Sequence, residues 1–306
     1  MKKLSCFMVI LGATFWGIIG IFVKGLYDLG FSSIQISFLR VFSAAIILSI
    51  YVLLTNKKAF KIKFRDIYYF IGTGIISIVI FNYCYFVAIK ETSLSVAAIL
   101  LYTAPSFVTV FSYLIFKEKI TLNKLISLIL TFLGCILVTG YFDSSSNKVS
   151  TIGLFCGIGS GIAYALYSIF GKLALKKYSS MTVTLYSFIL ATIGAFPLIP
   201  IKKTFSLTLN TKVIAYTLGL GLFSTVLAFL FYTIGLENLE PSKASILATV
   251  EPVVATLTSL IVFKQPMSIS QIEGIMLVIC ALLIVGLNKK FTFREKTKAE
   301  ENNLEM

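Results

Sequence analysis

The stretch "SILATVEPVVATLTSLIVFK", residues 245–264, is apolar and long enough to cross a bilayer, yet it carries Glu251 and Pro252 near its middle. An earlier stretch, "AILLYTAPSFVTVFSYLIFK" at residues 98–117, has the same length, the same proline position and the same "FK" ending. It has Ala104 where the later stretch has the glutamate. Because about 20 apolar residues span the hydrocarbon core as a helix, both stretches predict transmembrane helices.

The composition of the whole chain supports the same fold class. Of 306 residues, 58% are hydrophobic and 13% are charged, and the mean hydropathy is +0.94, whereas soluble domains carry about 25% charged residues. We therefore expect an all-α integral membrane protein. The net charge of +14 fits cationic loops at a cytoplasmic membrane face, and no soluble domain is expected that could present a basic face to nucleic acid.

The residues that are missing narrow the chemistry. The chain has no histidine, and its five cysteines fall in apolar segments without a CxxC pair. This excludes His-based catalysis and His metal ligands and favours neither a metal site nor a disulfide framework. No GxxxxGK[ST] motif is present, which argues against an intrinsic ATP motor. We expect no cofactor and no enzyme activity, and an intramembrane enzyme is the disfavoured alternative.

Ten apolar runs predict ten transmembrane helices. They fall near residues 5–24, 34–54, 67–88, 93–116, 122–141, 152–172, 181–200, 213–236, 244–263 and 268–287. If the N-terminus is cytoplasmic, the inner segments hold nineteen Lys and Arg and the outer segments seven, with Arg40 inside a helix. The excess of inner positive charge predicts that both termini are cytoplasmic, in a bacterial-type cytoplasmic membrane.

An internal repeat relates the two halves of the chain. Sliding residues 72–117 onto 219–264 gives 14 identities in 46 positions, among them Pro105 with Pro252. The predicted units are residues 1–143 and 144–288, each with five helices, followed by a polar cytoplasmic tail at 289–306. Because five is odd, the second copy enters the membrane from the opposite side, so the repeats are inverted. Inverted repeats with a site between them are typical of secondary transporters.

Five motifs stand out along the chain: "WGIIGIFVK", "SFLRVFSAAIIL", "TAPSFVTVFSYLIFKEKIT", "VEPVVATLTSLIVFKQPMS" and "QIEGIMLVICALLIVG". In these motifs the chain resembles the EamA-type branch of the drug/metabolite transporter superfamily. The resemblance implies ten helices, a central cavity and alternating-access transport of small metabolites, often amino acids or their derivatives. One departure is that the family commonly has a glutamate after the apolar stretch in both halves. This chain keeps Glu118 but has Gln265 in the second half.

Glu251 is the leading candidate for function. A charge near the bilayer centre costs roughly 2.5–3.5 kcal/mol, so the carboxyl group must face a wet cavity, have a cationic partner or stay protonated. We interpret it as a substrate-binding group and the candidate for proton coupling; a structural, neutral Glu251 is the alternative. Arg40 either extends to the outer headgroups, anchors an anionic substrate group or pairs with a carboxylate across the cavity, for which Glu251 is the candidate. Pro105 and Pro252 are expected to break their helices and to serve gating.

The remaining substrate-binding candidates are aromatic or polar side chains well inside their segments. They are Trp16, Asn82, Tyr85, Tyr102, Tyr164 and Tyr232. Packing against neighbouring helices is the alternative for each of them. The site is expected between the first, third, fourth, sixth, eighth and ninth helices. A glycine ridge at Gly153, Gly157 and Gly161 allows close packing within the chain or a homodimer.

From the sequence we expect a secondary active transporter that exports small metabolites such as amino acids or their derivatives. An uncoupled channel or facilitator is the alternative. The expected partners are the small-molecule substrate and membrane lipids, with no nucleic acid.

Overall fold

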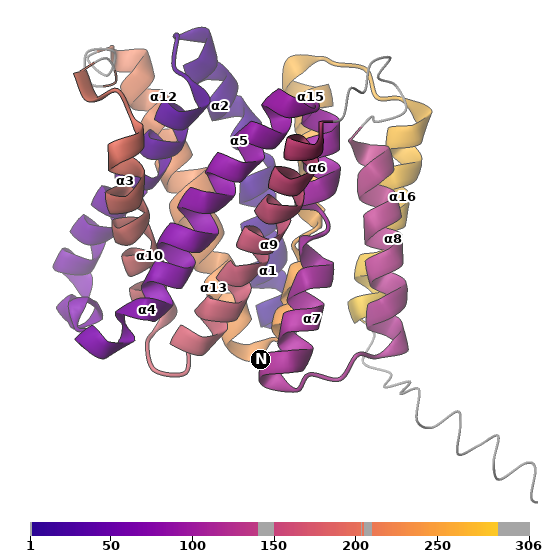
Figure 1. Ribbon diagram of the computed structural model, residues 1–306, viewed down its shortest axis with the longest axis horizontal. Coiled ribbons are helices and arrows are strands. Elements are labelled where there is room, and N and C mark those ends of the chain that lie inside the picture. Colours follow the sequence, from indigo (N-terminus) through magenta and orange to yellow (C-terminus); the bar gives the residue numbers. More distant parts are fainter. Residues whose placement is uncertain (1, 140–149, 203, 205–209, 287–306) are drawn as a thin grey trace, which may run out of the picture.

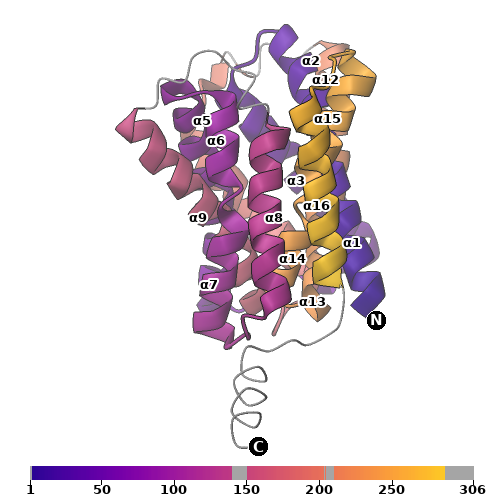
Figure 2. The ribbon, with the colours of Figure 1, turned by 90° about the vertical axis from the view of Figure 1, so that its right-hand side faces the viewer.

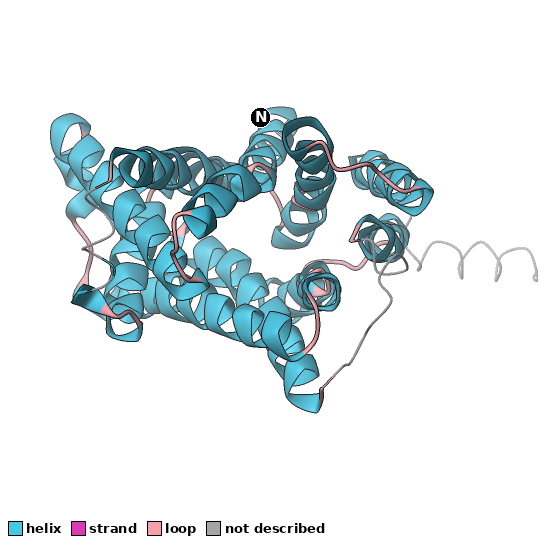
Figure 3. Ribbon diagram, turned by 90° about the horizontal axis from the view of Figure 1, so that it is seen from above, coloured by secondary structure: helices cyan, strands magenta, loops and turns pink. Residues whose placement is uncertain are grey.

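In the computed structural model, which describes residues 2–139, 150–202, 204 and 210–286, every regular element is helical (Figure 3). The predicted boundary at 143/144 and the tail at 289–306 lie outside the described residues. Nine helical stretches in the described part are apolar and long enough to cross a membrane. They are Lys2–Asp28, Ser33–Thr55, Phe64–Glu91, Leu94–Phe116, Thr151–Ala174, Ser180–Leu198, Thr211–Asn238, Pro241–Phe263 and Ile269–Gly286. The chain is a multi-pass membrane protein.

The tenth predicted segment forms a shorter helix. It runs over 17 residues, Leu122–Val138, where the sequence predicted 122–141. It packs along the last helix, Ile269–Gly286, and the two lie side by side at one edge of the bundle (Figure 2). That ten helices span the membrane stays a prediction.

Most spans are built from shorter pieces (Figure 1). In chain order the helices are α1 (Lys2–Gly17), α2 (Ile19–Asp28), α3 (Ser33–Thr55), η1 (Lys57–Phe60), η2 (Phe64–Asp66), α4 (Ile67–Phe70), η3 (Ile71–Ile80), α5 (Phe81–Glu91), α6 (Leu94–Leu101), α7 (Ala104–Phe116), α8 (Leu122–Val138), α9 (Thr151–Ala174), α10 (Ser180–Ala195), η5 (Phe196–Leu198), α12 (Thr211–Gly221), η6 (Leu222–Leu227), α13 (Ala228–Asn238), α14 (Pro241–Leu247), α15 (Val250–Phe263) and α16 (Ile269–Gly286). One of these breaks, between α14 and α15, lies directly before Glu251.

The third helix of each half contains a π-helical segment, η3 and η6. A π turn leaves a backbone carbonyl without its usual partner four residues on. Here hydroxyl groups take that role, since Ser77 donates to the carbonyl of Gly72 at 2.8 Å and Thr225 to that of Leu220 at 2.8 Å.

The two halves interlock. The first helix of each half packs on the third helix of the other, α1 on α13 and α9 on α5 and η3. Close approach requires glycine on α1 and α13, because a Cβ on Gly12 would lie 2.6 Å from the carbonyl oxygen of Ala228. A Cβ on Gly235 would lie 2.7 Å from that of Ser5. The buried core gathers around this contact and includes Val9, Ala13 and Leu236.

The glycine ridge of α9 faces the same chain. A Cβ on Gly157 would lie 2.3 Å from the side chain of Leu100, and one on Gly161 would lie 3.0 Å from the carbonyl oxygen of Leu100. The ridge therefore packs on α6 within the chain.

The two ends of the described chain lie at one end of the bundle. Lys2 begins α1 and Gly286 ends α16 at the lower end in Figures 1 and 2. We call this the N-terminal end of the bundle. That it faces the cytoplasm stays a prediction from the distribution of Lys and Arg.

Candidate functional site

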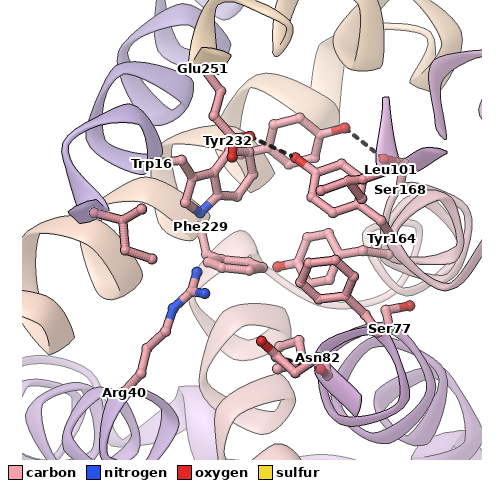
Figure 4. A pocket seen from close by; sticks show the side chains of 14 residues that line it. Trp16, Arg40, Ser77, Asn82, Leu101, Tyr164, Ser168, Phe229, Tyr232 and Glu251 are labelled. Atoms are coloured by element: carbon pink, nitrogen blue, oxygen red, sulfur yellow. Dashed lines mark hydrogen bonds between the residues drawn. The ribbon is translucent and has the colours of Figure 1, made fainter. Parts of the chain in front are cut away.

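A cavity of about 70 Å³ lies between the two halves (Figure 4). Its lining residues are Trp16, Ile19, Arg40, Ser77, Ile78, Phe81, Asn82, Leu101, Tyr164, Tyr167, Ser168, Phe229, Tyr232 and Glu251. Both halves contribute to the wall, and two side chains of opposite charge are part of it. In the described part of the chain, no cluster of three or more His, Cys, Asp or Glu that could hold a metal ion is found.

A helix break delivers Glu251 to this cavity. Helix α14 ends at Leu247, and α15 restarts at Val250 with Pro252 in its first turn, where a missing backbone N–H costs nothing. The glutamate therefore sits at a helix N-terminus, whose partial positive charge favours a carboxylate. Its Oε2 accepts a hydrogen bond from the hydroxyl of Tyr164 at 3.3 Å.

Arg40 enters from the opposite side of the view in Figure 4. It lies on α3, and its Nε donates to Oγ1 of Thr225 at 3.1 Å. Thr225 is itself fixed by the π turn of η6, so the guanidinium group is held by the second half of the protein. Its Cζ lies 5.7 Å from the ring centroid of Phe229, within the range of a cation–π contact. Arg40 thus faces the cavity and does not extend to the outer headgroups.

Arg40 and Glu251 share the cavity but do not form an ion pair with each other or with any other described residue. A charge inside a membrane protein without an ion-pair partner is costly, and such groups are typical of substrate pathways in membranes. The space between the two side chains therefore suits a ligand that carries an anionic and a cationic group.

Aromatic rings form the apolar part of the wall. The indole of Trp16 packs against Phe229 and Tyr232, with centroid distances of 4.9 and 5.2 Å. Tyr232 is held by a hydrogen bond between its hydroxyl and that of Ser168, 2.6 Å apart. The buried Nε1 of Trp16 has no hydrogen-bond partner among the described residues, so this donor is available to a ligand.

Asn82 occupies the edge of the cavity toward a second, smaller pocket. Its Nδ2 donates to the carbonyl of Ile78 at 2.6 Å, and its Oδ1 accepts from the hydroxyl of Ser37 at 3.3 Å. The second pocket, of about 30 Å³, shares Ile78 and Asn82 with the first. Asn82 thus joins the two spaces, and its amide is already engaged by protein groups.

The structure brings six of the eight predicted binding residues to one cavity. They are Trp16, Arg40, Asn82, Tyr164, Tyr232 and Glu251. Tyr85 is not among the lining residues and stacks on Phe81 at 5.7 Å. Tyr102 lines a small pocket that adjoins the cavity and shares Leu101, Tyr164 and Glu251 with it. That any of the eight binds substrate stays a prediction.

Several lining residues were not predicted, chiefly Ser77, Phe81, Ser168 and Phe229. Phe229 lies three residues before Tyr232 and Ser168 four after Tyr164, so helical spacing could have found both. Ser77 and Phe81 are four residues apart and directly precede Ile78 and Asn82, so the same spacing could have found them too. The prediction also omitted the second helix from the site, although α3 supplies Arg40.

A polar network joins the halves at the N-terminal end of the bundle. Buried Lys124 lies 2.7 Å from a carboxylate oxygen of Glu240 and 3.5 Å from one of Glu118. The hydroxyl of Ser242 also donates to Glu118. Nearby, the ammonium group of Lys172 donates to three carbonyls at the end of α13, at 2.8–2.9 Å. These contacts hold the ends of α7, α8 and α14 together and join α9 to α13 at this end.

Comparisons with known proteins agree with this architecture. The model of the EamA-like transporter family matches residues 3–140 and 151–287. An uncharacterised transporter of Archaeoglobus fulgidus is 30% identical over 278 residues, which cover 90% of this chain and 96% of the relative. The uncharacterised transporter YyaM of Bacillus subtilis is 26% identical, covering 92% and 94%. One crystal structure superposes with a TM-score of 0.73 at 14% identity, over 92% of this chain and 95% of the other, which shows a shared fold.

Proposed function

This chain belongs to the EamA-like transporter family, and we propose that it is a secondary active transporter that exports small metabolites such as amino acids or their derivatives. The observation that carries the substrate class is the cavity in which Arg40 and Glu251 face each other without pairing. A substrate carboxylate would bind the guanidinium group, and a substrate ammonium group would bind the carboxylate. The aromatic wall would accept the apolar part of the molecule.

The proposed transport cycle is alternating access by two inverted halves, residues 1–143 and 144–288. Trp16, Arg40 and Asn82 come from the first half, and Tyr164, Tyr232 and Glu251 from the second. A rocking motion of one half against the other would therefore open the site to one side and close it to the other. The π turns of η3 and η6 and the breaks before Pro105 and Pro252 are candidate points of bending.

Glu251 is the proposed coupling residue. A proton and a substrate ammonium group would compete for its carboxylate, which is the condition for exchanging one for the other. Tyr164 holds Oε2 in place for both ligands. The exporting direction and the bacterial-type cytoplasmic membrane rest on analogy with the family. No residue pattern in the sequence supports an enzyme or a nucleic-acid partner.

The first experiment uses purified protein in proteoliposomes with a panel of amino acids, their esters and their N-acylated derivatives. If the cavity binds a zwitterion, Arg40→Gln raises the KM for a carboxylate-bearing substrate about tenfold or more, because hydrogen bonds to charged groups contribute about 1.5–3 kcal/mol. The same variant leaves the KM for the matching ester unchanged. Lys24→Gln is the matched control, since Lys24 is exposed and pairs with Asp28 outside the cavity.

Two results would count against the proposal. If no compound of the panel enters faster than in protein-free liposomes, the substrate class is wrong. If a substrate moves but never accumulates against its gradient, the protein is the uncoupled channel or facilitator.

A further inference from the structure

A second hollow lies far from the cavity, at the N-terminal end of the bundle. It is a surface groove of about 520 Å³, lined by Lys61, Ile62, Lys63, Asp66, Lys177 and Tyr178. One wall is the segment that follows α3, and the other is the turn between α9 and α10. The groove therefore lies where two membrane-length helices end, Ser33–Thr55 and Thr151–Ala174, and two begin, Phe64–Glu91 and Ser180–Leu198, at the level of a bilayer surface.

The floor of the groove is fixed by contacts between the two halves. The ammonium group of Lys177 donates to Oδ1 of Asp66 at 2.6 Å, and the hydroxyl of Tyr178 donates to Oδ2 at 2.7 Å. The same hydroxyl accepts from the backbone N–H of Lys63 at 3.0 Å. The hydrogen bond to Asp66 raises the pKa of Lys177, so this lysine stays charged. Both carboxylate oxygens of Asp66 are thereby engaged by Lys177 and Tyr178.

Positive charge is in excess in the groove. Lys61 and Lys63 are exposed, and no described carboxylate pairs with either of them. Three lysines therefore face a single aspartate. The segment beside the groove, Lys57–Asp66, adds Lys57, Lys58 and Arg65, all exposed. The excess positive charge of the groove attracts an anionic ligand.

Exposed aromatic side chains indicate where the anion comes from. Phe64 is 85% exposed and Tyr68 is 49% exposed, and both lie directly beside the groove residues in the chain. Aromatic rings that flank basic residues at the end of a membrane helix are typical of the interface between headgroups and acyl chains. A ligand that reaches the groove from within the bilayer therefore meets apolar and cationic groups together, as a phospholipid requires.

We propose that this groove binds the phosphate headgroup of an anionic phospholipid, with Lys61 and Lys63 as the main ligands. The headgroup joins the Lys57–Asp66 segment of the first half to the α9–α10 turn of the second. The excess of two positive charges favours a lipid with two phosphates over one with a single phosphate. This site is separate from the transport cavity, and its test does not depend on the transported substrate.

The experiment is a lipid titration of the full chain, purified in detergent and followed by native mass spectrometry. Cardiolipin, phosphatidylglycerol and phosphatidylcholine are the probes. Wild-type protein is expected to bind cardiolipin most tightly and phosphatidylcholine most weakly. The double variant Lys61→Gln/Lys63→Gln should weaken cardiolipin binding about 25-fold, at roughly fivefold for each lysine near the surface. Lys61→Arg/Lys63→Arg should retain it.

The matched control is Lys2→Gln/Lys3→Gln, which removes the same charge from exposed positions at the same end of the bundle. It should leave cardiolipin binding unchanged. If Lys2→Gln/Lys3→Gln weakened cardiolipin binding as much as Lys61→Gln/Lys63→Gln does, the effect would come from general surface charge, and the proposal would be overturned. Equal binding of cardiolipin and phosphatidylcholine would also overturn it. Displacement of cardiolipin by inorganic phosphate alone would assign the groove to a soluble anion instead.

Discussion

Two segments 147 residues apart, Leu94–Phe116 and Pro241–Phe263, follow the same backbone path. Each breaks after its first two turns and restarts with a proline in the first turn of the second piece. Thr109 donates to the carbonyl of Pro105 at 2.8 Å, and Thr256 donates to that of Pro252 at 3.0 Å. Both end in a left-handed lysine with φ of 57°. The backbone break therefore belongs to the repeat.

The two breaks differ in the residue before the proline. Ala104 is 2% exposed and packs against Val108, Ala165 and Ile169, whereas Glu251 faces the cavity. The same backbone thus supports an apolar contact in one half and a charged wall in the other. What this difference teaches is that the repeat supplies the shape of the site and single substitutions supply its chemistry.

The largest effect is expected when the charge is placed in the wrong copy. Ala104→Glu puts a carboxylate among the apolar side chains of Val108, Ala165 and Ile169 and into the small pocket that Glu251 also lines, so it should cost about 3 kcal/mol of stability. Thermal unfolding of the purified protein in detergent measures this, with Ala104→Ser as the control of similar size to wild type. Glu251→Gln should unfold close to the wild-type temperature. A variant Ala104→Glu as stable as wild type would mean that the first break also borders a wet space.

Tyr164 offers a sharper test, because its side chain lies between the two breaks. It lines a small pocket together with Ala104, Pro105 and Glu251. Its hydroxyl donates a hydrogen bond to the carboxylate of Glu251, and Ala104 has no side-chain group that could accept one. Tyr164→Phe keeps the ring packing and removes the hydrogen bond to Glu251, worth about 1 kcal/mol, so transport should fall about fivefold. Initial rates in proteoliposomes measure the loss, with Tyr113→Phe, an exposed residue, as control. An unchanged rate would mean that Tyr164 does not hold the carboxylate.

The smallest effect concerns the far ends of the two segments. Glu118 is nearly buried, and burial raises its pKa above the ordinary value of 4.5, while Ser242 and Lys124 oppose the rise. A raised folded-state pKa gives stability that is fully present below the unfolded pKa and is lost as pH rises through the folded pKa. Unfolding temperatures measured from pH 4 upward should therefore fall less steeply in Glu118→Gln than in wild type.

The matched change in the other copy is Gln265→Glu. Gln265 is exposed, so this variant should stay within about 0.5 kcal/mol of wild type at every pH. If the two variants change the pH profile equally, the network at the N-terminal end does not depend on a buried glutamate.

Much of the fold follows from the sequence. Hydrophobic length predicted the helical spans, and Pro105 and Pro252 marked the two helix breaks, because both properties are local to the chain. Six cavity residues were predicted because polar or aromatic side chains in mid-membrane must face the interior. The membership in the EamA-like family, expected from the motifs, is confirmed.

The rest depends on contacts between distant residues. Tyr85 and Tyr102 share the residue type of their neighbours in the cavity, but the packing of α5 and α6 turns their rings elsewhere. The hydrogen bond from Arg40 to Thr225 joins residues that are 185 positions apart in the sequence, and Thr225 is itself positioned by its hydrogen bond to Leu220 in the π turn of η6. Whether a membrane arginine faces lipid or a cavity is decided by such a partner, which the pattern of one helix cannot show.

The measurement that tests the central claim most directly is gradient-driven accumulation by Glu251→Gln in proteoliposomes. It uses the best substrate of the panel and two imposed pH gradients, with Glu273→Gln on the exposed face of α16 as control. We predict that wild type and the control accumulate substrate in proportion to the gradient, and that Glu251→Gln only equilibrates it. Accumulation by Glu251→Gln with the wild-type pH response would contradict the assignment of Glu251 as the coupling residue.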